Sequence, residues 1–153
     1  MPPTRELQES MAKVVCELLS SQEGMERDLS GAGDSIGSVL DFRGVVRALE
    51  DGRAIRGIDY EAHESMALAQ LEKLGREAAA RFGLESVLIR HRVGFVAAND
   101  PSLVVRLMSA HRQEALKAMV WLIDELKKRV PIWKHPDFDA AEKTTARAGE
   151  FTR

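Results

Sequence analysis

The sequence predicts one α+β domain, in which two long helices cover one face of a mostly antiparallel sheet. Several short stretches alternate apolar and polar residues as half-buried strands do. Two longer segments carry apolar residues at helical spacing. The resulting order of strands, helix, strands and helix favours the α+β class. A chain of 153 residues is also long enough to bury a core within one domain.

The first third of the chain is expected to hold one strand. Residues 4–20 have a spacing that suits a helix, although 14–18 is also compatible with a short strand. Residues 20–37 are rich in Ser, Gly and Asp and predict a loop with room for one helical turn. Residues 38–47 are rich in Val and favour a strand, and Gly44 within them indicates a bulge or a close backbone approach. We assign 1–36 to an N-terminal segment of the same domain.

The middle of the chain predicts a hairpin and the clearest helix. Residues 50–52 are a turn signal. In the strand that follows, Ile58 and Tyr60 alternate with acidic residues. Residues 64–82 form an amphipathic helix, and Gly83 stands where a glycine commonly ends one.

The remainder predicts two strands and a second helix. Residues 87–93 and 103–108 are expected strands, separated by the turn-forming sequence Asn-Asp-Pro at 99–101. A helix is expected from about residue 111 to 129, with Ser109 as its N-cap and a proline at 131 that limits its extension. Residues 136–153 are polar and lack a sustained apolar face, so they are expected to stay mobile or to order against another subunit.

Composition excludes several functional classes. A net charge of −2 and 5% aromatic residues argue against a nucleic-acid surface. Cys16 is the single cysteine, so neither an internal disulfide nor a cysteine zinc site is expected. No signal pattern or long apolar run is found, so we expect a cytoplasmic protein without a membrane partner. No metal or other cofactor is expected, because acidic residues with metal-ligand spacing are missing.

Basic residues carry the functional signal. His111 and Arg112 open the second long helix, where the helix dipole disfavours cations, so the pair makes sense if an anion binds there. A solvated helix start with harmless charges is the alternative. Arg47 follows an apolar strand near the predicted turn, where it either contacts an anion or does nothing.

Two lysines are candidates for chemistry. On a helical wheel Lys127 shares a sector with Leu116 and Val120, which we interpret as the edge of the buried stripe. Partial burial there would lower the pKa of this lysine and suit a general base or nucleophile; the alternative is a packed stem with its head in water. Lys134 follows Trp133, which is expected to be buried and to hold it, although an exposed loop lysine fits equally well.

Other polar pairs are interpreted as structural. His91 and Arg92 close a strand, where polar residues usually cap or pair. Tyr60 and Glu61 are expected to make core and cross-strand contacts rather than acid–base chemistry.

With these residues in place, the sequence resembles the family of molybdopterin synthase large subunits, over roughly residues 37–135. The resemblance rests on FRGVVR at 42–47, YE at 60–61, MA at 66–67, HRVG at 91–94, SAHR at 109–112, DELK at 124–127 and PIWK at 131–134. It implies an α/β hammerhead fold and a catalytic core over 37–135. His135 and Pro136 depart from the pattern, because the family usually has an acidic residue soon after the PIWK lysine.

The resemblance also implies an activity. The substrate is expected to be precursor Z, a cyclic pyranopterin monophosphate. Sulfur is expected to come from the C-terminal glycine thiocarboxylate of a small ubiquitin-like subunit, and two transfers would give the dithiolene that later holds molybdenum. Family members form a central homodimer with one small subunit at each end, a heterotetramer.

Residue roles follow from the same resemblance. Lys127 is expected to be the main catalytic lysine and Lys134 to assist it in catalysis or binding. Arg47, His111 and Arg112 are expected to hold the substrate. Val45, Val46 and His135 lie in the same segments and are expected to line the pocket, and Arg147 is a candidate for an arginine contributed across the dimer. The alternative is a non-catalytic homologue that binds a phosphorylated small molecule or a ubiquitin-like partner; retention of both lysines argues against it, because arginine serves phosphate binding at least as well.

Overall fold

The computed structural model describes residues 12–29 and 33–139. Within them the chain forms two α-helices, one short 3₁₀ helix and eight strands. In chain order these are β1 (Lys13–Leu19), η1 (Glu23–Glu26), β2 (Ser38–Val45), β3 (Leu49–Glu50), β4 (Arg53–Ala62), α2 (Glu64–Phe82), β5 (Ser86–Arg92), β6 (Gly94–Ala97), β7 (Pro101–Ser109), α3 (Arg112–Arg129) and β8 (Ile132–Phe138).

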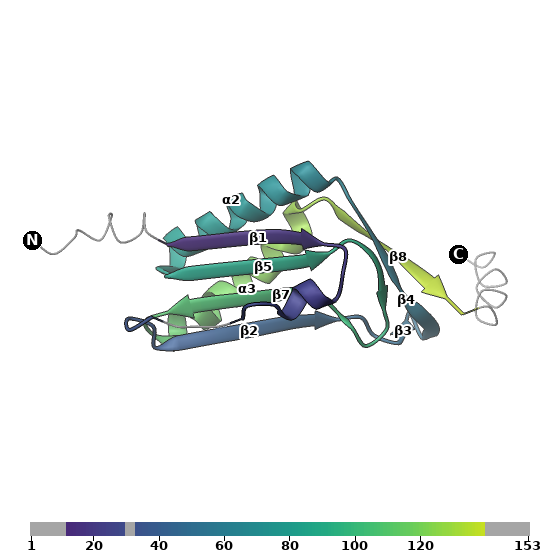
Figure 1. Cartoon of the computed structure of the whole chain (residues 1–153), viewed down its shortest axis with the longest axis horizontal. Coiled ribbons are helices and arrows are strands. Elements are labelled where there is room, and N and C mark those ends of the chain that lie inside the picture. Colours follow the sequence, from purple (N-terminus) through teal and green to yellow (C-terminus); the bar gives the residue numbers. More distant parts are fainter. Residues whose placement is uncertain (1–11, 30–32, 140–153) are drawn as a thin grey trace, which may run out of the picture.

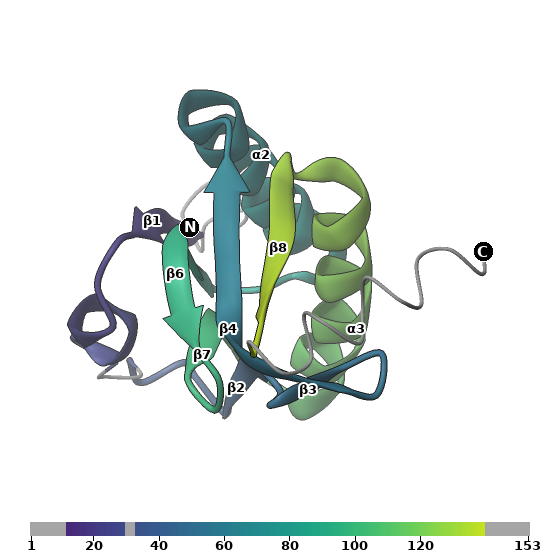
Figure 2. The same cartoon turned by 90° about the vertical axis from the view of Figure 1, so that its right-hand side faces the viewer.

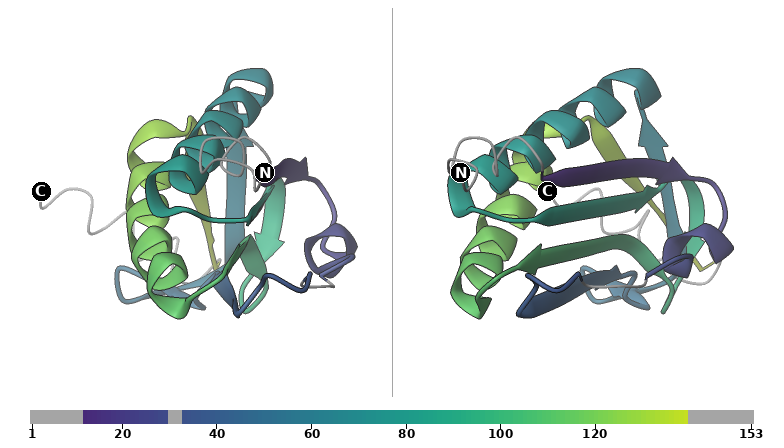
Figure 3. Two further views of the ribbon diagram at one scale, coloured as in Figure 1. Left: turned by 90° about the vertical axis from the view of Figure 1, so that its left-hand side faces the viewer. Right: turned by 60° about the vertical axis from the view of Figure 1, so that its left-hand side comes forward.

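The larger sheet has the strand order β1-β5-β7-β2. Strand β1 runs parallel to β5, whereas β7 is antiparallel to both β5 and β2. Helices α2 and α3 lie side by side on one face of this sheet (Figures 1 and 3). The main core fills the space between them and includes Leu71, Leu74, Val87, Ile89, Val105, Leu107 and Leu122, all fully buried. The predicted α+β arrangement is therefore confirmed.

A smaller sheet lies across one end of the larger one. Its central strand is β4, which pairs antiparallel with β6 along one part of its length and with β8 along most of it. Figure 2 shows β6, β4 and β8 side by side. Five buried residues form a second apolar cluster under this sheet: Val46, Ile55, Ile58, Tyr60 and Val96.

Three glycine-dependent features agree with the sequence. The β3–β4 hairpin closes through Asp51 and Gly52 with φ of 52° and 77°, and two positive φ values are what a two-residue type I′ turn requires. Gly83 ends α2 in the left-handed conformation at φ 68°. The β2–β7 register shifts between Gly44 and Val45, so the predicted bulge is present.

The first strand corrects the helical prediction for residues 4–20 over its described part. Val14, Cys16 and Leu18 recur every second residue and pack against the main core, as strand periodicity requires. The pairing Val14↔Val87 and Cys16↔Ile89 stabilises β1 as an edge strand. Pairing with a strand some seventy residues away outweighs the local helical spacing. Residues 1–11 lie outside the described part.

The second half of the chain brings further corrections. Ser109 is not the N-cap of α3; that residue is His111, whose carbonyl accepts a hydrogen bond from the Ser109 hydroxyl at 2.5 Å. Strand β6 forms where a loop was expected. Strand β8 extends to Phe138, so residues 136–138 belong to a sheet, although we expected the polar C-terminal segment to begin at 136. The rest of that segment lies outside the described residues.

Candidate active site

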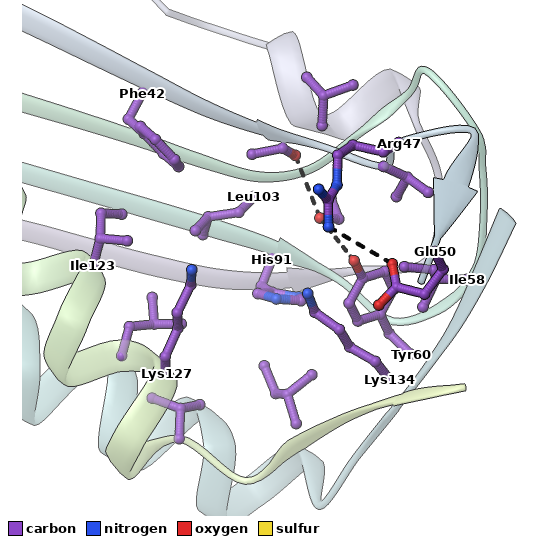
Figure 4. Close-up of a pocket in the computed structure, with 17 residues that line it drawn as sticks. Phe42, Arg47, Glu50, Ile58, Tyr60, His91, Leu103, Ile123, Lys127 and Lys134 are labelled. Carbon is purple, nitrogen blue, oxygen red and sulfur yellow. Dashed lines mark hydrogen bonds and ion pairs between the residues drawn. The ribbon is translucent and has the colours of Figure 1, made fainter. Parts of the chain in front are cut away.

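A pocket of about 570 Å³ opens where the smaller sheet meets the larger sheet and the end of α3 (Figure 4). It is lined by Phe42, Gly44, Val45, Val46, Arg47, Glu50, Ile58, Tyr60, His91, Ser102, Leu103, Ile123, Leu126, Lys127, Val130, Ile132 and Lys134. Its walls therefore come from β2, β3, β4, β5, β7, α3, β8 and the loop after β2. Five of the predicted site residues line it although they come from distant parts of the sequence: Val45, Val46, Arg47, Lys127 and Lys134.

The end of α3 places both lysines. The helix stops at Arg129, and Pro131 separates it from β8, which begins at once. Lys127 therefore stands on the last turn of α3, while Lys134 stands on the strand that returns beside it. The register pairs Lys134 with Tyr60 of β4, and Lys134 lies on the same face of β8 as Ile132 because side chains alternate along a strand.

Two expectations about burial at the lysines are wrong: that Lys127 is partly buried, and that Trp133 beside Lys134 is buried. The α3 sector that Lys127 shares with Leu116 and Val120 faces solvent, and these two apolar side chains are 51% and 67% exposed. Lys127 itself is exposed, so the partial burial that we expected for this lysine is missing in a single chain. Trp133 is 52% exposed rather than buried, and Lys134 is held by the pairing of β8 with β4 instead.

Arg47 lies at the mouth of the pocket with Val45 and Val46. Its side chain is 81% exposed and its guanidinium lies 4.0 Å from the carboxylate of Glu50. An exposed ion pair of this length contributes little stability, so Arg47 is free to move toward an anionic ligand. Val46 is buried in the small cluster and Val45 is half exposed.

His135 does not line the pocket. Because side chains alternate along β8, it lies on the opposite face of the strand from Lys134. There its Nε2 lies 2.8 Å from Oε2 of Glu61, a cross-strand contact on the solvent-facing side. The cross-strand contact expected for Glu61 is therefore confirmed. The core contact expected for Tyr60 agrees with its buried position.

His111 and Arg112 lie at the other end of α3. They border a separate open hollow of about 510 Å³ together with Gly37, Ala110, Gln113 and Glu114. A rise of 1.5 Å per residue puts Arg112 about 22 Å from Lys127 along the helix. One chain therefore does not bring the His–Arg pair and the two lysines together. Arg147 lies outside the described residues.

His91 is a pocket residue that sequence reasoning assigned to a structural role. It is only 6% exposed, and its ring stands edge-on to Tyr60 at 5.2 Å between centroids. Burial lowers the pKa of His91 below its usual 6.5, and the Lys134 charge lowers it further, against a hydrogen bond to the backbone that raises it. The sequence offered one signal for a pocket role of His91: a histidine stands among the buried residues at the end of β5.

Arg92, by contrast, is structural as expected. Its guanidinium donates to the carbonyls of Ser20 and Phe95 and to the Gln22 side chain. These bonds tie the chain after β1 to the start of β6, away from the pocket.

A polar chain runs along the wall of the pocket beside Tyr60. The Tyr60 hydroxyl donates to Ser102 Oγ at 3.1 Å, and Ser102 donates to the carbonyl of Gly44 at 3.3 Å. Burial raises the pKa of Tyr60, so it remains a neutral donor. Among the described residues no group of three or more His, Cys, Asp or Glu could hold a metal ion, and no helix is long and apolar enough to cross a membrane.

Comparison with known proteins identifies relatives of this chain. The model of the MoaE protein family matches residues 14–129. The molybdopterin synthase catalytic subunit of Pyrococcus abyssi is 37% identical over 111 residues, which cover 72% of this chain and 75% of the relative. That of Culex quinquefasciatus is 40% identical over 108 residues, covering 70% and 69%.

Solved structures show the same fold. The molybdopterin synthase of Staphylococcus aureus superposes with a TM-score of 0.68 at 27% identity, covering 85% of this chain and 93% of that one. A complex of subunits 1 and 2 of molybdopterin-converting factor from Helicobacter pylori gives 0.62 at 23% identity, covering 85% and 90%, which supports the fold alone. From the family match and the curated relatives together, this chain belongs to the MoaE family of molybdopterin synthase catalytic subunits.

Proposed function

We propose that this enzyme transfers sulfur from the C-terminal thiocarboxylate of a small ubiquitin-like subunit to precursor Z, forming the dithiolene of molybdopterin. The observation that carries the proposal is the convergence of Arg47, Lys127 and Lys134 on one pocket from three separate elements. Such a cluster suits a substrate with a phosphate and a sulfur donor that is itself an anion. The apolar part of the wall, which includes Phe42 and Leu103, offers a surface for a flat ring system.

The mechanism uses these groups in turn. The thiocarboxylate sulfur attacks a carbon of the substrate side chain and forms a C–S bond, while the bond from that carbon to a hydroxyl or phosphate oxygen breaks and the oxygen leaves with the electron pair. Water then hydrolyses the resulting thioester, which releases the substrate thiol and the carboxylate of the carrier glycine. The lysine ammonium groups stabilise the negative charge that develops in both steps. Lys127 shuttles a proton to or from the reacting centre or stabilises the tetrahedral carbon of the thioester. Positioning of the flexible glycine tail in the pocket supplies much of the remaining rate.

Activity is tested by mixing the protein with a thiocarboxylated small subunit and precursor Z and following the dithiolene product by mass spectrometry. Lys127→Ala is expected to lower turnover by about a hundredfold or more. Lys128→Ala is the matched control, because Lys128 stands on the same turn, contacts Glu125 at 3.9 Å and does not line the pocket. Circular dichroism checks the folding of both variants.

Two outcomes would contradict the proposal. Near-normal turnover by well-folded Lys127→Ala would remove this lysine from the reaction. Binding of both partners by the wild-type protein without product would favour the non-catalytic homologue, which holds a phosphorylated ligand or a ubiquitin-like partner without chemistry.

We propose that a homodimer brings the two ends of α3 together, so that the start of α3 in one copy lies beside the end of α3 in the other. Arg112, Leu116, Val120 and Lys127 fall within one sector of the helix, and the two apolar members of this stripe are exposed. If two copies pack antiparallel through this stripe, a two-fold axis near its centre places Arg112 of one copy beside Lys127 of the other. The His–Arg pair would then reach the pocket of the second copy, with a small subunit at each end of the homodimer.

Complementation tests the shared site. Lys127→Ala and Arg112→Ala are each expected to be inactive alone, whereas a co-refolded mixture should regain roughly a quarter of wild-type activity, because half of the dimers are mixed and carry one intact site. A mixture no more active than its components would show that each site is built within one chain.

A further inference from the structure

Among the described histidine, lysine, arginine and acidic residues that line the pocket, His91 is the least exposed, and no role follows for it from the sulfur-transfer mechanism. The residue is 6% exposed. Within residues 12–29 and 33–139 only its Nδ1 has a hydrogen-bond partner. Nε2 has none, yet it is not among the side-chain atoms that are buried without a partner, so it is accessible from the pocket that His91 lines.

The satisfied nitrogen fixes the tautomer of the ring. Nδ1 of His91 lies 2.7 Å from the carbonyl oxygen of Arg92. A carbonyl can only accept, so the proton must be on Nδ1. Because burial and the nearby Lys134 charge lower the pKa of His91, the imidazole stays neutral, and Nε2 keeps a lone pair that can accept a hydrogen bond.

The free nitrogen belongs to a ring that lines the pocket near Lys134. Figure 4 shows the end of the Lys134 side chain beside the His91 ring. The edge-on contact with Tyr60 also holds the ring, and the Tyr60 hydroxyl is in turn hydrogen-bonded to Ser102. Lys134 stands opposite Tyr60 in the β4–β8 register, so all three side chains belong to one packed unit.

We propose that His91 is a positioning residue for Lys134: its neutral Nε2 accepts a hydrogen bond from the Lys134 ammonium and directs the remaining N–H groups toward the substrate anion. The proposal rests on the sulfur-transfer function assigned to the pocket. An ammonium on a flexible four-carbon stem loses much of its freedom when one of its three donors is held, and a misplacement near 1 Å can cost about a hundredfold in rate.

Two substitutions separate this role from a structural one. Asparagine can keep the donor to the Arg92 carbonyl but places nothing at the position of Nε2. Glutamine reaches that position with an acceptor oxygen. We expect His91→Asn to lower kcat by about tenfold to a hundredfold with KM little changed, and His91→Gln to retain kcat within about threefold. The reverse ranking would overturn the proposal and make the Arg92 bond the function of His91.

The pH profile provides a second comparison. The titratable and charged groups that line the pocket with His91 are Tyr60, Lys134, Lys127, Arg47 and Glu50, and among them the charge of Lys134 disfavours protonation of His91. As pH falls below the usual histidine range, protonation of His91 removes the acceptor and repels Lys134, so wild-type kcat should fall. His91→Gln should lack this acidic limb, and an unchanged limb would contradict the proposal.

Nuclear magnetic resonance of the free protein tests the contact without any turnover. Long-range ¹H–¹⁵N spectra of the imidazole should show the Nδ1–H tautomer, and Lys134→Met should shift the Nε2 signal. An Nε2–H tautomer, or an Nε2 signal indifferent to Lys134→Met, would overturn the proposal whether or not the protein transfers sulfur. Failure of the activity assay with both spectral results as expected would instead count against the proposed function.

Discussion

The two apolar cores of this molecule differ in size and in what borders them. The main core fills the space between two helices and a four-stranded sheet and consists of aliphatic residues with a methionine. The small cluster has five buried residues, and three of them, Val46, Ile58 and Tyr60, also line the pocket. Ile132 packs against both cores. The site thus lies where a large stabilising core meets a small core that carries polar groups.

The largest expected effect on stability lies in the main core. Leu107 of β7 is fully buried, and its replacement by alanine should lower the free energy of unfolding by about 3–4 kcal/mol. Urea denaturation followed by circular dichroism measures this. Lys117→Ala, at an exposed position of α3, is the control and should change stability by less than about 0.5 kcal/mol. A loss below about 1 kcal/mol for Leu107→Ala would mean that this core is loosely packed.

Ile58→Ala tests the small cluster. Ile58 is 3% exposed but lies beside the pocket, so neighbouring side chains can relax into the space. We expect a loss of about 2 kcal/mol, at the low end for such substitutions, together with reduced sulfur transfer because the β4 wall shifts. A loss in the free energy of unfolding equal to that of Leu107→Ala would show that the two cores do not differ in how well they relax around a smaller side chain.

Asp41→Asn probes the uncovered face of the larger sheet. Asp41 accepts two hydrogen bonds from Arg106, at 2.6 and 2.7 Å. We expect a loss of about 1–2 kcal/mol at neutral pH. The Arg106 hydrogen bonds hold the pKa of Asp41 below its usual 3.8, so the stabilisation is present above 3.8 and disappears as pH falls through the lower folded value. Urea titrations at pH 7 and near pH 2 check this, and a difference from wild type that persists unchanged at pH 2 would contradict it.

The smallest expected change in stability accompanies the largest change in activity. Lys127 is exposed, so Lys127→Ala should alter the free energy of unfolding by less than about 0.5 kcal/mol, although we expect it to lower turnover by about a hundredfold or more. The same urea titration compares it with Lys128→Ala. A loss above about 1 kcal/mol would show that Lys127 supports the fold as well as the reaction.

Local signals were sufficient for the long helices and the turns. Apolar residues recurring at helical spacing identify α2 and α3, and Gly83 and Pro131 identify where they end, because these constraints act within a few residues. The Asp51-Gly52 hairpin follows from backbone sterics alone. Residues 4–20 were predicted as a helix with a short strand at 14–18 as the alternative, and only the pairing of β1 with β5 decides for the strand. Strands β6 and β8 were missed because they depend on β4.

The candidate site divides in the same way. The sequence by itself predicted a site with Arg47, Lys127 and Lys134, which stand in recognisable motifs, and these three line one pocket. Only the tertiary structure decided that Lys134 faces the pocket while His135 faces Glu61, because a strand turns alternate side chains to opposite faces and the β4–β8 register selects which. It also decided that His91 borders the site and that His111 and Arg112 lie a helix length away, since distances between elements are set by packing.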